Sequence, residues 1–276
     1  RKTTKVFKVI RIYKKLNNTK EDFIMNQQNE MINKQLDHRT IREFKDQSIP
    51  SDIFDQLMEV GRRTATSNGM QGCSIVRVTD ATLRKEISEV CKQEYVARAP
   101  ELLIFLVDQN RNWNIAKEKK CFEDSAKDMD RFFQGFTDAC ITAQNIVNAA
   151  EAMDLGTVYL GSILNDSEKI CELLKLPELT FPVVGLGIGY PNQSPSLKPR
   201  MDMKLRVFEN SYKNFDNYLE KIKDYDEELH TYYDLRNANR RVDCFSDQVV
   251  TRLQNAAPKR QEMLQVIRKQ GFDLKL

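Results

Sequence analysis

Histidine is scarce in this sequence, which has only His38 and His230 among 276 residues. The sequence also has no H-E-x-x-H helix and no G-x-x-x-x-G-K-[ST] loop that would cradle a nucleotide phosphate. With two histidines, the sequence offers few residues from which a zinc site or a Ser-His-Asp triad could be built. We expect no metal site and no hydrolytic chemistry.

The cysteines form no C-x-x-C pair, and none has a histidine at metal-ligand spacing. They are Cys73, Cys91, Cys121, Cys140, Cys171 and Cys244. Scattered cysteines in apolar segments are typical of buried thiols in a reducing compartment. No run reaches the roughly 18 apolar residues of a membrane span, and no uninterrupted apolar block marks a secretory signal. We therefore expect a cytoplasmic protein without a membrane partner.

Positive charge is concentrated at the N-terminus. Residues 1–20 carry eight Lys or Arg and no acid, whereas the remaining residues carry 35 basic and 40 acidic side chains. The body is thus mildly acidic, which does not favour a nucleic-acid partner. The basic tail of residues 1–24 has three interpretations: a non-native extension ahead of a natural start at Met25, an organelle presequence, or a contact with an anionic surface. We expect it to be non-native or disordered.

The apolar pattern of the body predicts one main domain of alternating strands and helices. Ser51 as N-cap, followed by apolar residues at helical spacing, predicts a helix that closes at Gly61. The other predicted elements are strands at 74–78, 102–107, 158–160 and 182–188, and helices at 83–91, 123–153 and 167–174. This order indicates an α+β or α/β fold with a mixed central sheet wrapped by helices.

After Pro199 the sequence becomes more charged, and we expect helices at 218–236 and 249–270 with an arginine-rich stretch between them. We interpret residues 201–276 as an extension of the core. The segment Gly185-Leu186-Gly187-Ile188-Gly189 superficially matches a dinucleotide fingerprint, but prolines follow where a helix should receive the pyrophosphate. The interpretation we favour is that these glycines allow close backbone packing.

Two basic clusters lie about 155 residues apart. In an extended segment, His38, Thr40 and Arg42 would project to one side while Ile41 points into the core, although this pentapeptide alone is equally well interpreted as a charged turn. Lys198-Pro199-Arg200 adds two cations in a rigid loop, and a guanidinium can grip phosphate through two bonds. The small residues within 156–162 offer backbone amides to a flat or anionic ligand. Together the three segments indicate a phosphate-bearing ring cofactor.

The ordered set of segments 38–44, 63–68, 156–162 and 197–200 resembles the nitroreductase/flavin reductase superfamily. The likeness runs from about Met31 to Leu276 and is closest to the oxygen-insensitive NADPH-dependent nitroreductase and NADPH-FMN reductase branch. It implies an α+β, domain-intertwined homodimer with FMN in a groove between subunits, so that one chain makes half of each site. Residues 25–200 would form the FMN-binding core, and residues 201–276 would contribute to the dimer and to NADPH binding.

The resemblance also implies roles for individual residues. Positions that hold the FMN phosphate and ribityl end are matched by His38, Arg39, Thr40, Lys198 and Arg200. Polar contacts to the cofactor are matched by Thr66 and Gln93, and the strand end that faces the isoalloxazine by Tyr159, Leu160, Gly161 and Ser162. The positions that recognise the 2′-phosphate of NADPH are matched by Arg236, Arg240 and Arg260.

The implied activity is that of an FMN-dependent NAD(P)H oxidoreductase. Hydride from NADPH would reach flavin N5, Arg42 would stabilise the negative charge at the N1–O2 edge, and two electrons would pass to a nitroaromatic, quinone or flavin acceptor in a ping-pong sequence. The chain departs from the branch pattern at residues 65–70, which are usually serine-rich, and at Thr157, usually a glycine. The arginines near Arg240 are shifted by about one residue, which leaves NADH as an alternative reductant. The alternative function is a non-catalytic protein that binds a nucleotide or an anionic surface through the basic tail.

Overall fold

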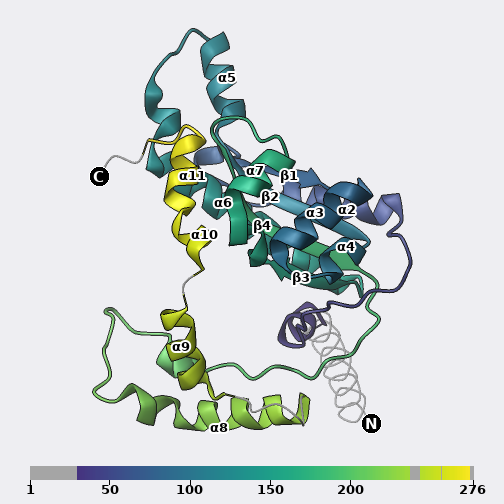
Figure 1. Cartoon of the computed structure of the whole chain (residues 1–276), viewed down its shortest axis with the longest axis vertical. Coiled ribbons are helices and arrows are strands. Elements are labelled where there is room, and N and C mark those ends of the chain that lie inside the picture. The colour runs from purple at the N-terminus through teal and green to yellow at the C-terminus, as the bar shows by residue number, and fades with distance from the viewer. Residues whose placement is uncertain (1–29, 237–242, 256, 274–276) are drawn as a thin grey trace, which may run out of the picture.

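The computed structural model describes residues 30–236, 243–255 and 257–273 (Figure 1). Both the basic tail of residues 1–24 and Arg240 lie outside these ranges. The centre is a four-stranded sheet in the order β1-β2-β4-β3, made of β1 (Cys73–Arg77), β2 (Glu101–Asp108), β3 (Gly156–Leu160) and β4 (Thr180–Gly189). These strands pair antiparallel. A parallel bridge from Thr40 to Thr157 then lines the other side of β3, so the sheet is mixed at this edge.

Helices cover both faces of the sheet. On one face lie α2 (Ser51–Arg62) and α6 (Met129–Ala152), whose core is joined by residues of α11 (Met263–Lys269). On the other lie α3 (Ala81–Cys91), α4 (Tyr95–Arg98), the 3₁₀ helix η3 (Gly161–Asp166) and α7 (Ser167–Leu173). Every residue of β2 is buried because its alternate side chains enter the two cores, with Leu103 and Phe105 in one and Leu102 and Ile104 in the other.

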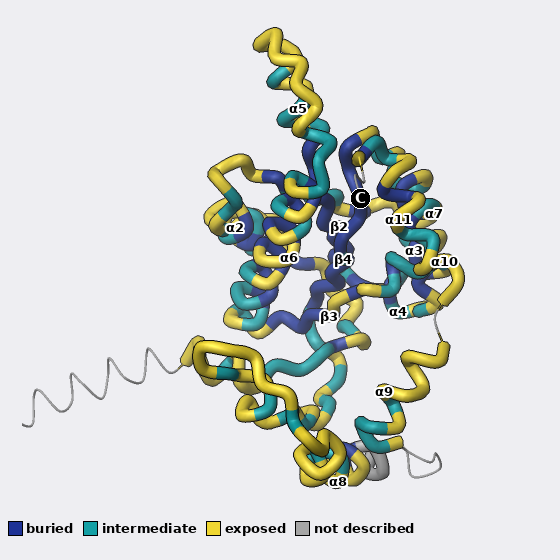
Figure 2. Tube along the Cα trace, turned by 90° about the vertical axis from the view of Figure 1, so that its left-hand side faces the viewer, coloured by how far each residue is buried: buried dark blue, intermediate teal, exposed yellow. Residues whose placement is uncertain are grey.

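The C-terminal extension leaves the sheet and returns to it. Figures 1 and 2 show α8 (Tyr218–Arg236) and α9 (Phe245–Gln254) packed together apart from the sheet, whereas α10 (Pro258–Gln261) and α11 run back along the core. The other described elements are a helix over residues 30–36, α5 (Asn110–Glu118) and the 3₁₀ helices η1 (Ser67–Gly69), η2 (Asp124–Lys127) and η4 (Met203–Leu205). Within the described ranges, no helix combines the length and the apolarity needed to cross a membrane.

The structure corrects several predicted boundaries. Pro50, not Ser51, is the N-cap residue of α2, and Gly61 lies inside the helix, where a Cβ would come within 2.9 Å of Ile146 Cδ1. The helix predicted from 123 begins only at Met129, because η2 and the extended backbone of Asp128 precede it. The helix predicted at 249–270 is three helices. The break before α10 falls at Pro258, which disfavours helical backbone at the preceding residue.

Other predictions are confirmed. The helix at 218–236 is α8, and the four strands lie where apolar runs predicted them. Within β4, a Cβ on Gly185 would lie 3.0 Å from Leu160 and one on Gly189 would lie 2.7 Å from Pro100. These glycines therefore serve close packing, and no helix follows them directly to receive a pyrophosphate.

Candidate functional site

The segment of residues 38–42 runs along the free edge of β3. The amide of Ile41 donates to the carbonyl oxygen of Thr157 at 2.9 Å, and the Ile41 side chain is buried. Gly156 makes this approach possible, because a Cβ there would lie 2.7 Å from Ile41 Cγ1. As predicted, Ile41 thus enters the core, while Arg42 beside it is exposed.

The two basic clusters meet in one pocket of about 110 Å³, which we call the anion pocket. It is lined by His38, Arg39, Thr40, Arg42, Pro195, Ser196, Lys198, Arg200 and Tyr232. Five of these residues carry basic side chains and none is acidic. Because ligand pockets usually span about 300–1,000 Å³, this pocket suits one charged end of a larger ligand.

Several donors at the anion pocket are available to an anion. Arg39 Nε is buried with no hydrogen-bond partner in the described part of the chain. The Arg42 side chain is exposed and makes no ion pair or hydrogen bond to another described residue. Arg200 folds back onto its own loop, donating to the carbonyl oxygens of Lys198 and Pro199 at 3.1 and 3.2 Å. Guanidinium groups carry donors only, so this arrangement fits a phosphate.

Beyond the end of β3, a second pocket of about 650 Å³ brings Gln93, Ser162 and Arg260 together. Ser162 Oγ donates to Gln93 Oε1 at 2.7 Å. Arg260 donates to the carbonyl oxygen of Gly161 and, at 3.3 Å, to Asn165 Oδ1. Of the other two predicted NADPH residues, Arg236 ends α8 without a described side chain and Arg240 lies outside the described ranges.

Gly161 leaves an open surface at the end of β3. A Cβ on Gly161 would meet no atom within 4 Å, and its φ is not left-handed, so neither packing nor backbone conformation requires glycine here. The preceding Leu160 is buried in the core, whereas Tyr159 is 39% exposed and its hydroxyl lies 3.3 Å from Gln144 Oε1. Partial burial raises the pKa of the Tyr159 phenol. The backbone of Gly161 is thus accessible to a flat group.

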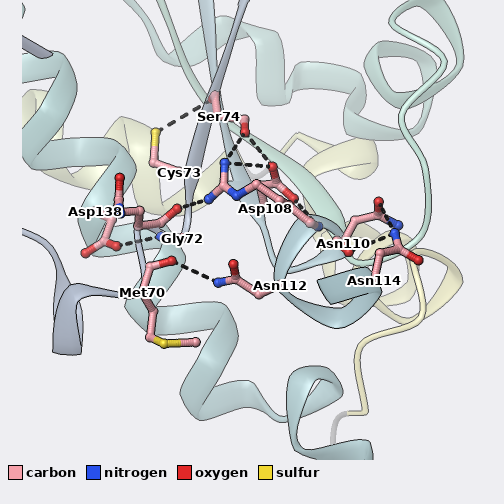
Figure 3. Close-up of polar contacts among 11 residues, drawn as sticks. Met70, Gly72, Cys73, Ser74, Asp108, Asn110, Asn112, Asn114 and Asp138 are labelled. Atoms are coloured by element: carbon pink, nitrogen blue, oxygen red, sulfur yellow. Dashed lines mark hydrogen bonds and ion pairs between the residues drawn. The ribbon is translucent and has the colours of Figure 1, made fainter. Parts of the chain in front are cut away.

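Thr66 lies in a different place. Its loop leads into β1, and β1 and β3 are opposite edges of the sheet. Asp138 of α6, 1% exposed, holds this loop by accepting the amides of Ser67 and Gly72, each at 2.9 Å. Figure 3 shows the bond to Gly72. Asn112 donates to the Met70 carbonyl oxygen at 2.9 Å from the other side. Thr66 lines neither the anion pocket nor the second pocket.

The sequence analysis missed three residues that shape these regions: Tyr232, Asp138 and Glu151. Tyr232 of α8 closes one side of the anion pocket, and its hydroxyl lies 3.4 Å from the Ser196 carbonyl oxygen. Asp138 and Glu151 both lie on α6. For Asp138 and Glu151, the sequence did contain a signal: both are acidic residues within a helix whose other face residues are small and apolar. Because a buried carboxylate needs a hydrogen-bond partner, such residues point to a specific contact.

Comparison with known proteins identifies the class. Residues 36–190 match the Nitroreductase family, and residues 198–275 match the Nitroreductase family, C-terminal domain. The oxygen-insensitive NADPH nitroreductase of Salmonella typhimurium is 36% identical over 236 residues, covering 85% of this chain and 95% of the relative. An NADPH-dependent oxidoreductase of Staphylococcus saprophyticus is 35% identical over 239 residues, covering 85% and 94%.

Solved structures agree with these sequence matches. NfrA2 of B. megaterium has a TM-score of 0.84 at 30% identity, covering 90% of this chain and 99% of its own. The NADPH:FMN oxidoreductase from Vibrio harveyi, complexed with NAD⁺, has a TM-score of 0.80 at 31% identity, covering 89% and 100%. The chain therefore belongs to the nitroreductase family, as the resemblance predicted. It is an NAD(P)H-dependent oxidoreductase with an α+β fold.

Proposed function

We propose that this protein uses FMN and NADPH, with NADH as the alternative reductant, to reduce nitroaromatic, quinone or flavin acceptors by two electrons in a ping-pong sequence. The observation that carries the proposal is that two basic clusters, far apart in sequence, line one acid-free pocket. The names of the relatives, which include an NADPH:FMN oxidoreductase and an NADPH nitroreductase, support the same cofactors and acceptors.

The residues present fit FMN. The unpartnered Arg39 Nε and the other donors of the anion pocket would hold its phosphate, and the side of Gly161 where a Cβ would meet no atom within 4 Å would accept its ring. When bound, FMN supplies a group that accepts hydride and passes electrons onward. Arg42 contributes a guanidinium group, whose positive charge would stabilise negative charge on the cofactor. Gln93 and Ser162 would add polar contacts beside the second pocket.

Arg260 is the predicted NADPH-binding residue whose side chain the structure describes. It lines the second pocket, of about 650 Å³, and a guanidinium suits the 2′-phosphate that distinguishes NADPH from NADH. We propose the same role for Arg236 and Arg240, on the resemblance alone.

We further propose that two copies of the chain complete each site. Thr66 and Gly161 lie beyond opposite edges of the sheet, an arrangement that fits a flavin held between Gly161 of one copy and Thr66 of another. Exposed apolar side chains on α6 and the extension, such as Phe133 at 60% and Leu253 at 80%, offer surface for such a contact. The two family matches, over residues 36–190 and 198–275, support a division of the chain near residue 200. On the resemblance alone, we propose that the core binds FMN and that the extension serves the dimer and NADPH. All six cysteines are free thiols, which supports a cytoplasmic location.

The test is reconstitution followed by turnover. The purified chain is incubated with FMN, freed of excess flavin, and assayed for oxidation of NADPH and then NADH with nitro compounds, quinones and FMN as acceptors. We expect a retained flavin spectrum and faster turnover with NADPH. Absence of bound flavin after reconstitution would refute the proposal.

A further inference from the structure

We propose that Glu151 is a positioning residue for the anion pocket: it holds His38 as an imidazolium whose second N–H donates to the phosphate of the cofactor. This inference rests on the proposed function, because it assigns the phosphate of FMN to the pocket. Glu151 itself does not line the anion pocket, so it would act only through His38.

The geometry around Glu151 fixes one side of the His38 ring. Glu151 lies in the last turn of α6 with a side chain that is only 13% exposed. Its Oε1 receives two bonds, one from Thr157 Oγ1 at 2.6 Å and one from His38 Nδ1 at 2.7 Å. A carboxylate only accepts hydrogen bonds, so Nδ1 carries a proton in this arrangement. Nε2 makes no hydrogen bond to the residues that the structure describes.

The protonation of His38 follows from what lies on its two sides. A neutral ring with its proton on Nδ1 would present a bare, accepting Nε2 to a phosphate, which is also an acceptor. Two acceptors, one on each side of the ring, require two donors and therefore the imidazolium form. Four other cations line the same pocket and oppose a fifth positive charge: Arg39, Arg42, Lys198 and Arg200. Glu151 is the acid in direct contact that offsets them.

The neighbouring acids are engaged elsewhere. His38 also lines another cavity, of about 180 Å³, whose lining includes Lys34, Asp37, Arg39, Glu151 and Asp154. Asp37 is paired with Arg39, and Asp154, whose side chain is 82% exposed, is paired with Lys34. Neither touches His38 through a hydrogen bond or ion pair within the described ranges. Glu151 is also held in position by a second contact, because it accepts a hydrogen bond from the hydroxyl of Thr157. Thr157 is only 1% exposed and is therefore itself fixed by packing.

Binding of FMN and of riboflavin to the flavin-free full-length chain tests this inference, because the two ligands differ by the phosphate. Glu151→Gln keeps the shape of the side chain and removes its charge. Because charge-assisted hydrogen bonds are roughly twice as strong as neutral ones, we expect FMN affinity to fall about tenfold, or ~1.4 kcal/mol. Riboflavin affinity should stay unchanged. Flavin fluorescence titration measures both constants.

Asp154→Asn is the matched control. It makes the same charge change three residues away in the same cavity, and asparagine tolerates the left-handed backbone of this position, whose φ is 59°. We expect it to leave both affinities as in the wild type. A general loss of structure in Glu151→Gln would instead weaken FMN and riboflavin together, and that result would overturn the inference.

A double-mutant cycle with His38→Asn decides whether Glu151 acts through His38. If it does, the combined variant binds FMN about as weakly as His38→Asn alone, since coupled residues are not additive. Additive losses would contradict the proposed coupling. The failure of the inference also differs from that of the proposed function: a wild-type chain that prefers FMN to riboflavin, with Glu151→Gln unchanged, refutes only the role of Glu151. A wild-type chain that binds neither flavin refutes the function as well.

Discussion

Gly156, in β3, and Gly161, directly after β3, should respond differently to replacement by alanine. At Gly161 a Cβ meets no atom within 4 Å, whereas at Gly156 it would lie 2.7–2.8 Å from three atoms of the buried Ile41 side chain. The first glycine thus leaves space for a ligand, and the second leaves space for the protein itself. Replacing each by alanine separates cofactor binding from stability.

The magnitudes follow from these contacts. Gly161→Ala should change the free energy of unfolding by no more than about 0.5 kcal/mol, as for other open positions. Gly156→Ala must displace Ile41, a stiff β-branched residue, and overpacking of this kind costs about 1–3 kcal/mol. For a chain of this size, we convert that cost to a fall in Tm of roughly 2–12 °C. In the flavin titration, Gly161→Ala should weaken FMN binding about tenfold, if an added methyl in the ring contact costs ~1–3 kcal/mol as in a packed core.

Thermal unfolding without flavin and fluorescence titration with FMN give the two readouts. Gly161→Ala should bind FMN more weakly at an unchanged Tm, whereas the main effect of Gly156→Ala should be a lower Tm. An alanine at 161 that binds FMN as tightly as the wild type would refute the placement of the flavin ring on this backbone. A large loss of Tm in the same variant would refute the claim that the glycine faces open space.

Three further outcomes are expected. Arg42→Ala should keep the wild-type Tm, because the side chain is exposed without a polar partner among the described residues, but should slow flavin reduction in stopped-flow measurements; unchanged reduction would remove Arg42 from the mechanism. Glu101→Gln should lower the free energy of unfolding by about 2 kcal/mol. This is less than the loss expected for a fully buried ion pair, because the partner Arg77 is 42% exposed. An unaltered midpoint in a denaturant titration would contradict this prediction. Burial raises the pKa of the Cys73 thiol to about 12, so at pH 8 iodoacetamide should label the exposed Cys121 far ahead of Cys73, and equal labelling in mass spectra would contradict this.

Strands and helices with a clear apolar period were predictable because their signal is local. The run that became β2 is apolar throughout, and the structure shows why, since both of its faces are covered. The two basic clusters suggested a site for a phosphate-bearing cofactor only when they were taken together with the small residues within 156–162, because residues 38–42 alone could equally be a charged turn. Their meeting in one pocket was an expectation that only tertiary structure could test, because it depends on how β3 and the loop after β4 are placed.

The missed features depend on contacts that sequence patterns do not contain. Strand order and antiparallel pairing follow from long-range packing, and the break before Met129 depends on a 3₁₀ turn that apolar spacing does not reveal. Thr157 was noted only as a departure from the branch pattern. In the structure it is buried, bridges Thr40 and donates its hydroxyl to Glu151. The threonine at this position thus makes a specific contact with α6, and the sequence alone does not show that α6 lies beside it.

The charge of the body as a whole does not decide which ligands this chain binds. Outside the tail, acids outnumber bases, yet the lining of the anion pocket contains no acid. Asp37 and Glu151 contact Arg39 and His38 without lining the pocket themselves. An acid inside the pocket would compete with a phosphate for the same donors, whereas an acid behind the base occupies one donor and leaves the others directed at the ligand. If the pocket binds the phosphate of FMN as we propose, the acids outside its lining leave its donors available to that anion.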